Sequence, residues 1–153
     1  MNRSGAFLIG GLVCLLGVSI FLFRSCGTEA VQTPESFVKK FYSYEEIGDF
    51  GSSWELFHPF MKDKFGKDKY IERKAHVFMH EMGATTFTLS VGEKVKLTDW
   101  KYTKEELALS TVYKIPVTLT YDQTQFGVLS IGQTCYVVEE NGKWEMMWEY
   151  REE

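Results

Sequence analysis

The chain has 153 residues, of which 44% are hydrophobic and 25% are charged, and its formal net charge is −4. Arg3 and Arg24 are the only basic residues before Gly27, so the rest of the chain holds 15 of the 17 Lys and Arg residues against all 21 Asp and Glu, a formal charge of −6. This acidic balance argues against binding to nucleic acid or to an anionic lipid surface. The length after Gly27 suits one domain with a hydrophobic core and is too short for two.

The first feature along the chain is an uncharged run of nineteen residues, Gly5 to Phe23. As a helix it would span about 28 Å, close to the ~30 Å hydrocarbon core of a bilayer. We therefore predict a membrane anchor or signal segment over residues 1–27, inserted in the membrane through residues 5–23. Arg3 and the N-terminal amine outweigh Arg24, which favours a single-pass topology with the N-terminus inside and the domain outside. A short basic start before an apolar run is also typical of a bacterial export signal.

Cys26 offers an alternative anchor, because a bacterial lipoprotein is lipidated on a cysteine that follows its signal segment. Arg24 departs from the small residues expected before such a cysteine, so an uncleaved transmembrane helix is favoured over lipidation. Cys14 lies inside the apolar run and Cys135 lies in a predicted strand, so the three cysteines do not form a disulfide framework. Cys135 is interpreted as a small buried hydrophobic residue.

A polar spacer over residues 28–33 leads into the predicted domain at residues 34–153. Thr33-Pro34 is typical of a helix start, with an N-cap followed by proline at the first helical position. Lys67-Asp68 is a further capping pair, and Gly83 a helix stop. Apolar spacing predicts three amphipathic helices, over residues 34–47, 52–57 with a further turn over 60–65, and 69–82.

From Thr85 the apolar period changes from 3.6 to 2, which is typical of strands. Four antiparallel strands are predicted over residues 85–97, 107–121, 126–140 and 143–150, with an irregularity at Gly92. Asn141-Gly142 is a strong two-residue hairpin signal. Pro116 has no amide donor and must lie at a bulge or beside an unpaired edge. The fold class is therefore α+β: an N-terminal transmembrane helix, then three helices packed on a curved four-stranded antiparallel sheet.

This order of elements resembles the nuclear-transport-factor-2-like, cystatin-like cone superfamily. Several short segments are similar to the N-terminal, non-catalytic domain of methicillin-resistance-type penicillin-binding proteins. These segments are Pro34–Phe41, Gly48-Asp49-Phe50 before Trp54, Lys69–Glu72 and Glu140–Trp148. The resemblance implies a bacterial extracytoplasmic module at the cell envelope. Because no transpeptidase follows in this chain and Gly-x-Ser-x-Gly is absent, an acyl-transfer enzyme is not expected.

Two histidines four residues apart, His76 and His80, have the spacing of metal ligands on one helical face. His58 would be a third ligand only if its loop folded back. The two lie opposite the apolar stripe of the predicted helix, and the general-base glutamate of a His-Glu-x-x-His motif is missing. We therefore predict a solvated polar face on which Glu72 pairs with His76, with no metal and no cofactor.

Cone folds of this superfamily often hold a pocket between the sheet and the helices. The residues that could line one here are Asp99, Tyr113, Tyr121, Trp144 and Trp148. Large aromatics on an alternating strand face more often fill the core, so we expect the cone to be plugged. A scaffold would instead need an exposed aromatic patch, for which the candidates are Tyr42, Phe50, Phe60 and Phe65. For any single one of these residues, packing under the helices is favoured over exposure.

The function predicted from these features is a membrane-tethered, extracytoplasmic, non-catalytic binding or scaffold module with a protein partner at the cell envelope. The alternatives are a small-ligand pocket protein and an isomerase-like enzyme of the same fold.

Overall fold

The computed structural model describes residues 32–102 and 109–149. They belong to one compact unit, Gln32–Glu153, which is separate from Met1–Val31. Within the described ranges no helix is both long enough and apolar enough to cross a membrane. The predicted anchor at residues 5–23 and Cys26 lie outside these ranges.

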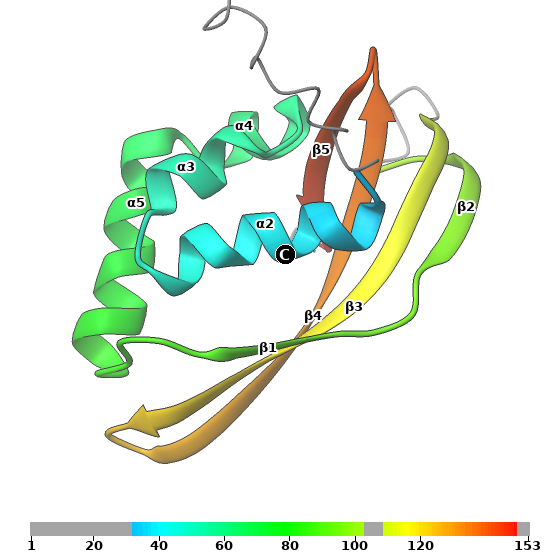
Figure 1. Cartoon of the computed structure of the whole chain (residues 1–153). Helices are drawn as coiled ribbons and strands as arrows, with labels where there is room; N and C mark the ends of the chain where they lie inside the picture. The colour runs from blue at the N-terminus through cyan, green and yellow to red at the C-terminus, as the bar shows by residue number, and fades with distance from the viewer. Residues whose placement is uncertain (1–31, 103–108, 150–153) are drawn as a thin grey trace, which may run out of the picture. The chain divides into compact units, whose positions relative to one another are not determined.

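The fold is α+β, with helices on one side of a twisted antiparallel sheet (Figure 1). The elements in chain order are α2 (Pro34–Glu46), α3 (Phe50–Glu55), α4 (Pro59–Lys64), α5 (Lys67–Ala75), the π-helical segment η1 (His76–Glu81), β1 (Thr88–Val91), β2 (Val95–Trp100), β3 (Leu109–Thr124), β4 (Gly127–Glu140) and β5 (Lys143–Trp148). The described residues thus form four α-helices and five strands, where the sequence predicted three helices and four strands.

Helix α2 begins where the sequence predicts. The Ser36 amide donates to Thr33 Oγ1 at 3.1 Å and the Thr33 amide donates to Ser36 Oγ at 2.9 Å, a reciprocal cap that satisfies two helix-end donors. Phe37, Val38 and Phe41 then form the buried face of the helix. This face packs on the sheet, and Figure 1 shows α2 lying across it.

The helices after α2 begin or end at other residues than the sequence predicted. Helix α3 starts at Phe50, because the Asp49 carboxylate accepts from the Ser52 amide at 3.0 Å and caps it. The single helix predicted over residues 69–82 begins at Lys67 and changes to π-helix at His76. There the Met82 amide donates to the Val77 carbonyl five residues back, at 2.9 Å.

The sheet has the order β1-β3-β4-β5, with β2 pairing with another part of β3. The one strand predicted over residues 85–97 is split, because β1 ends before Gly92 and β2 begins after Lys94. Pro116 of β3 faces this break, and its carbonyl accepts from the Gly92 amide at 2.9 Å. No strand is left facing the missing amide hydrogen of Pro116, which confirms its predicted place beside an unpaired edge.

The last hairpin is also as predicted. Asn141 and Gly142 both have positive φ, 53° and 75°, as a two-residue turn of the type favoured in hairpins requires. β5 lies at the end of the strand order, but its edge is partly covered. The His58 amide donates to the Met146 carbonyl and the Met146 amide donates to the Leu56 carbonyl, both at 3.0 Å.

An aromatic cluster fills the space between the helices and the sheet. Trp148 at the end of β5 meets Phe57 at 4.8 Å, Phe41 at 5.7 Å and Tyr70 at 5.9 Å between ring centroids. These residues come from α2, the α3–α4 connection, α5 and β5. The cluster therefore ties all the layers of the domain together.

Candidate functional site

Glu45 near the end of α2 is the most unusual polar group inside the domain. It is only 6% exposed. Ser53 Oγ and Tyr70 Oη donate to its Oε1 at 2.5 and 2.7 Å, and Lys74 Nζ donates to its Oε2 at 2.5 Å. A buried carboxylate is stable only when it is paired and hydrogen-bonded, and here the protein itself provides all of these partners.

The groups with shifted pKa values around Glu45 are three tyrosines and Cys135, and all four are held in their neutral forms. Burial, and then the Glu45 charge, raises the pKa of Tyr70 and of Tyr121 well above the usual value. Burial raises the pKa of the Cys135 thiol to about 12, in the direction opposite to that of a nucleophilic cysteine. Burial, together with Cys135, also raises the pKa of Tyr42, whose hydroxyl donates to Gln133 Oε1 at 2.8 Å. None of these four groups ionises near neutral pH.

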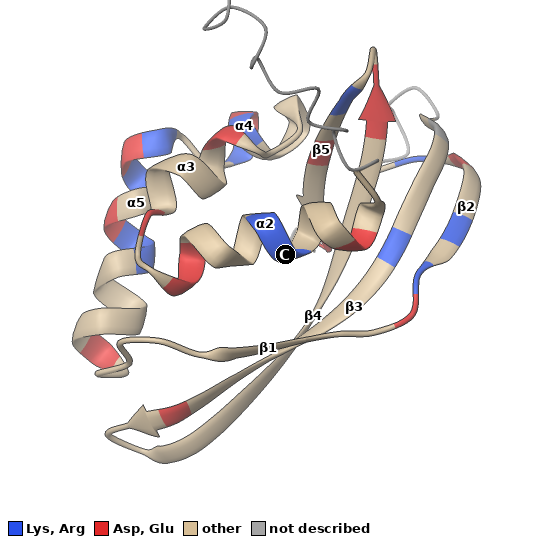
Figure 2. Ribbon diagram, in the orientation of Figure 1, with Lys and Arg blue, Asp and Glu red and all other residues tan. Residues whose placement is uncertain are grey.

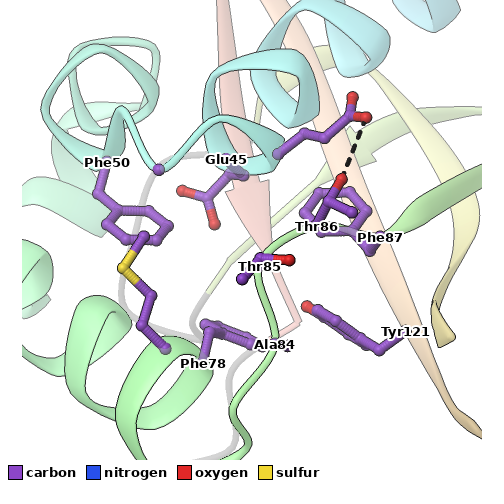
Figure 3. Close-up of a pocket in the computed structure, with 11 residues that line it drawn as sticks. Glu45, Phe50, Phe78, Ala84, Thr85, Thr86, Phe87 and Tyr121 are labelled. Atoms are coloured by element: carbon purple, nitrogen blue, oxygen red, sulfur yellow. Dashed lines mark hydrogen bonds between the residues drawn. The ribbon is translucent and has the colours of Figure 1, made fainter. Parts of the chain in front are cut away.

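The cavity beside Glu45 has a volume of only about 20 Å³. Figure 3 shows Glu45, Phe50, Phe78, Phe87 and Tyr121 around it. The Phe78 and Tyr121 rings stack at 5.5 Å, and Phe87 lies 5.4 Å from Tyr121. A volume of this size holds about one water molecule, far below the several hundred Å³ of an ordinary ligand pocket.

The residues predicted to line one pocket are dispersed over the domain, apart from Tyr113 and Trp144, whose rings meet. Tyr121 lines the small cavity, whereas Tyr113 packs against Trp144 at 6.1 Å and Trp148 lies in the aromatic cluster. The reason is the length of β3: eight residues separate the two tyrosines, roughly 26 Å along an extended strand. Asp99 is exposed, in a left-handed conformation with φ of 51°.

His58 caps α4 and pairs with the last hairpin. The ring is 4% exposed, and Nδ1 accepts from the Phe60 amide at 3.2 Å. Nε2 lies 3.3 Å from Glu140 Oε2 and 3.9 Å from Glu145 Oε2, a group of three that has the right atoms for a cation. Because Nδ1 accepts a hydrogen bond, Nε2 of the neutral ring carries the hydrogen and acts as a donor to the carboxylates. Apart from the Asn141-Gly142 turn, no sequence feature predicted these partners.

His76 and His80 lie together on η1, with ring centroids 5.3 Å apart, and both are exposed. His76 Nε2 is 3.1 Å from Glu81 Oε1, so the predicted pairing with Glu72 is replaced by one within the π-helical segment. Within the described residues, the group of three potential metal ligands that includes His58 is completed by Glu140 and Glu145. His76 and His80 do not belong to it.

The four candidates for an exposed aromatic patch do not form one, and they pack against the core as the favoured alternative predicted. Tyr42 and Phe50 are buried, and Phe60 and Phe65 are half-buried, because the short helices fold back over the core. At the β3–β4 turn, however, Phe126 is 74% exposed, and Val128 beside it is 70% exposed.

One nucleophile-like spacing is present in the first helix, where Ser36-Phe37-Val38-Lys39 has the form Ser-x-x-Lys. Ser36 Oγ donates to the Thr33 carbonyl at 2.8 Å and accepts from the Thr33 amide. The residue is exposed at a helix start and both of its hydrogen-bonding roles serve the cap. The motif is therefore explained by the helix cap.

A wider groove lies between α5, η1 and the end of β5, with a volume of about 390 Å³. We call it the cationic groove, and its lining residues are Lys64, Phe65, Lys69, Tyr70, Arg73, Lys74, Val77, Phe78 and Trp148. Of these, the sequence singled out Trp148 as a pocket residue. The basic residues were not predicted, because they fall among acidic residues in the α5 sequence.

Comparison with known proteins identifies the fold. No family model and no curated protein matches the chain. Among solved structures it is similar to a proposed NTF2-like transpeptidase from Campylobacter jejuni, with 16% identity, a TM-score of 0.50, and coverage of 75% of this chain and 97% of that one. The fold is therefore nuclear-transport-factor-2-like, as predicted. At this identity the likeness concerns the fold alone.

Proposed function

We propose that this chain is a membrane-tethered, extracytoplasmic module that binds or positions a partner at the cell envelope and performs no chemistry of its own. The observation that carries this proposal is the filled interior of the cone. The space beside Glu45 is about 20 Å³, and the carboxylate is already engaged by Ser53, Tyr70 and Lys74.

A catalytic cone would need an acid or base whose protons can be exchanged with a substrate. Glu45 meets the requirement of position but not of space, because the cavity beside it has a volume of only about 20 Å³ and is lined by the stacked rings of Phe78 and Tyr121. The raised pKa values of Tyr70, Tyr121 and Cys135 remove these groups as acids or bases near neutral pH. These features favour a structural role for the interior.

The proposed membrane anchor is inferred from the sequence. The uncharged run at residues 5–23 has the length of a transmembrane helix. The resemblance to the N-terminal domain of penicillin-binding proteins, drawn from short sequence segments, implies a domain held outside the cytoplasm. We propose a single-pass anchor with the N-terminus inside, and lipidation at Cys26 as the alternative. A small-ligand pocket protein is the second candidate function, and the open cationic groove is the observation that favours it.

Cysteine labelling in intact bacterial cells tests the tether. The chain would carry Gln123→Cys, an exposed position of β3, and would be treated with a membrane-impermeant maleimide. We expect labelling of intact cells. Labelling only after lysis would contradict an extracytoplasmic domain. The variant and its control both carry Cys26→Ser, because the proposed topology places Cys26 outside as well. The control keeps Gln123, and its Cys135 is buried in the native domain and reacts only after denaturation.

A further inference from the structure

We infer that the cationic groove is a binding site for an anion attached to a flat aromatic ring system. This inference goes beyond the proposed function and does not depend on the tether. It rests on three features of the groove: its charge, its aromatic floor and its size.

The charge of the groove is opposite to that of the domain. Among the described residues, its lining includes four basic side chains and no acidic one, although the chain after Gly27 has a formal charge of −6. Lys69 and Arg73 stand four residues apart on α5, about 6 Å along the helix axis, and both are exposed. Neither forms an ion pair with another described residue. Figure 2 shows basic residues along α4 and α5, where acidic residues are interspersed with them.

Lys74 at the base of the groove has a different role. Its Nζ is 2.5 Å from Glu45 Oε2 and lies over the Phe78 and Trp148 rings, at 4.7 and 4.8 Å from their centroids. Its charge is therefore balanced by the protein, and it holds the two rings in place. A ligand anion is left to pair with Lys69 and Arg73 on the rim.

The floor of the groove is apolar and aromatic. Tyr70, Phe78 and Trp148 line it, and Val77 adds an apolar side chain that is 41% exposed. The indole Nε1 of Trp148 is buried and makes no hydrogen bond to the described residues, so it donates nothing to the groove. A flat ring laid on this floor gains stacking and burial of apolar area, which a simple inorganic anion cannot gain.

The size and surroundings of the groove limit the ligand further. A volume of about 390 Å³ lies at the lower end of the range for drug-sized ligands and accommodates two fused rings with an acidic group. A long polyanion would extend beyond the groove over an acidic domain and be repelled. The ligand class is therefore a small aromatic carboxylate, sulfonate or phosphate.

The test uses naphthalene-1-sulfonate as the probe and uncharged naphthalene-1-sulfonamide as its matched control. The full chain, ¹⁵N-labelled at its four tryptophans, is kept in non-ionic detergent, and the indole N–H signals are followed by NMR. We expect the sulfonate to shift the Trp148 signal saturably and to leave Trp100 and Trp144, which do not line the groove, unchanged. The sulfonamide should bind at least about tenfold more weakly, because it cannot pair with the cations.

Two double variants test the cations. Lys69→Gln with Arg73→Gln should weaken sulfonate binding about tenfold, since two exposed charges are lost and glutamine keeps the helix. Lys39→Gln with Lys40→Gln, at exposed positions on α2, should leave it within about twofold. The inference is overturned if the Trp148 signal does not move, if the sulfonamide binds equally well, or if both double variants bind alike. None of these results bears on the labelling experiment, so the two proposals fail separately.

Discussion

The cone interior and the cationic groove share Tyr70 and Lys74, which bond to Glu45 and also line the groove. The two regions differ in whether their charged groups are paired within the protein. In the interior, Glu45 is buried and surrounded by donors from α3 and α5. On the rim of the groove, Lys69 and Arg73 are exposed and unpaired within the described residues. A charge that the protein has already neutralised contributes to folding, whereas a charge left at the edge of an apolar cavity is available to a ligand.

The largest expected effect follows from breaking the interior pair. Glu45→Ala would leave Lys74 partly buried without its counter-ion and should lower the free energy of unfolding by about 3–5 kcal/mol. Urea denaturation monitored by tryptophan fluorescence measures this loss. The matched control is Glu46→Ala. Because Glu46 is exposed, its substitution should lower the free energy of unfolding by less than about 0.5 kcal/mol.

A second variant separates charge from packing. Combining Glu45→Gln with Lys74→Met removes both charges, so the double variant should be more stable than Glu45→Ala. If Glu45→Ala were no less stable than Glu46→Ala, the interior carboxylate would not be structural and the contrast with the groove would fail.

The break between β1 and β2 is expected to be the next most sensitive feature. A Cβ added at Gly92 would lie 2.8 Å from Pro116 Cγ and 3.3 Å from its carbonyl oxygen. Gly92→Ala should therefore cost about 1–3 kcal/mol through overpacking. Gly132→Ala on β4 is the control, because nothing lies within 4 Å of its added Cβ. Equal thermal stability of the two variants would contradict this prediction, because it would show that Gly92 and Pro116 can move apart without cost.

Alkaline pH should lower the free energy of unfolding through the buried Cys135 thiol. The pKa of Cys135 is about 12 in the folded domain and 9.0 for an ordinary thiol, so the folded state binds the proton more tightly. Below pH 9 the thiol is protonated in both states, and its full contribution to stability is present. As the pH rises from 9 toward 12, the thiol ionises in the unfolded state first, and the free energy of unfolding falls by about 2 kcal/mol by pH 10.5.

Urea titrations at pH 8 and pH 10.5 check this dependence. Cys135→Ala should lose less stability between the two values than wild type does, although Tyr42 and Tyr70 act in the same direction in both proteins. An equal pH dependence would show that the thiol does not contribute.

The smallest effect on stability is expected at the groove. Lys69→Gln with Arg73→Gln should change the unfolding free energy by less than about 0.5 kcal/mol, because both side chains are exposed. Differential scanning calorimetry checks this. A loss comparable to that of Glu45→Ala would mean that the rim cations support the fold, and would remove the reason to assign them to a ligand.

The sequence predicted best what depends on neighbouring residues. The Thr33-Pro34 helix start, the Asn141-Gly142 turn and the unpaired edge at Pro116 all follow from local backbone chemistry. The sequence also predicted an irregularity at Gly92, where the first predicted strand is split. That the irregularity divides the strand could not be read locally, because Gly92 meets Pro116 only once the sheet has formed.

The candidate site was hidden for a related reason. The partners of Glu45 lie 8, 25 and 29 residues away along the chain, and no periodic pattern links them. The cationic groove needs Trp148 from the last strand beside α5, two segments far apart in sequence. Phe60 and Phe65 follow the favoured alternative to an exposed patch, because the helix breaks return the chain to the core instead of exposing it.

The most direct test of the account is a crystal structure of the protein soaked with naphthalene-1-sulfonate. The account predicts ring density on Trp148 with the sulfonate between Lys69 and Arg73, and at most one water molecule in the cavity beside Glu45. Ligand density between Phe78 and Tyr121, with the Glu45 contacts opened, would contradict it. In that case the cone interior would be the binding site, and the search would turn to substrates.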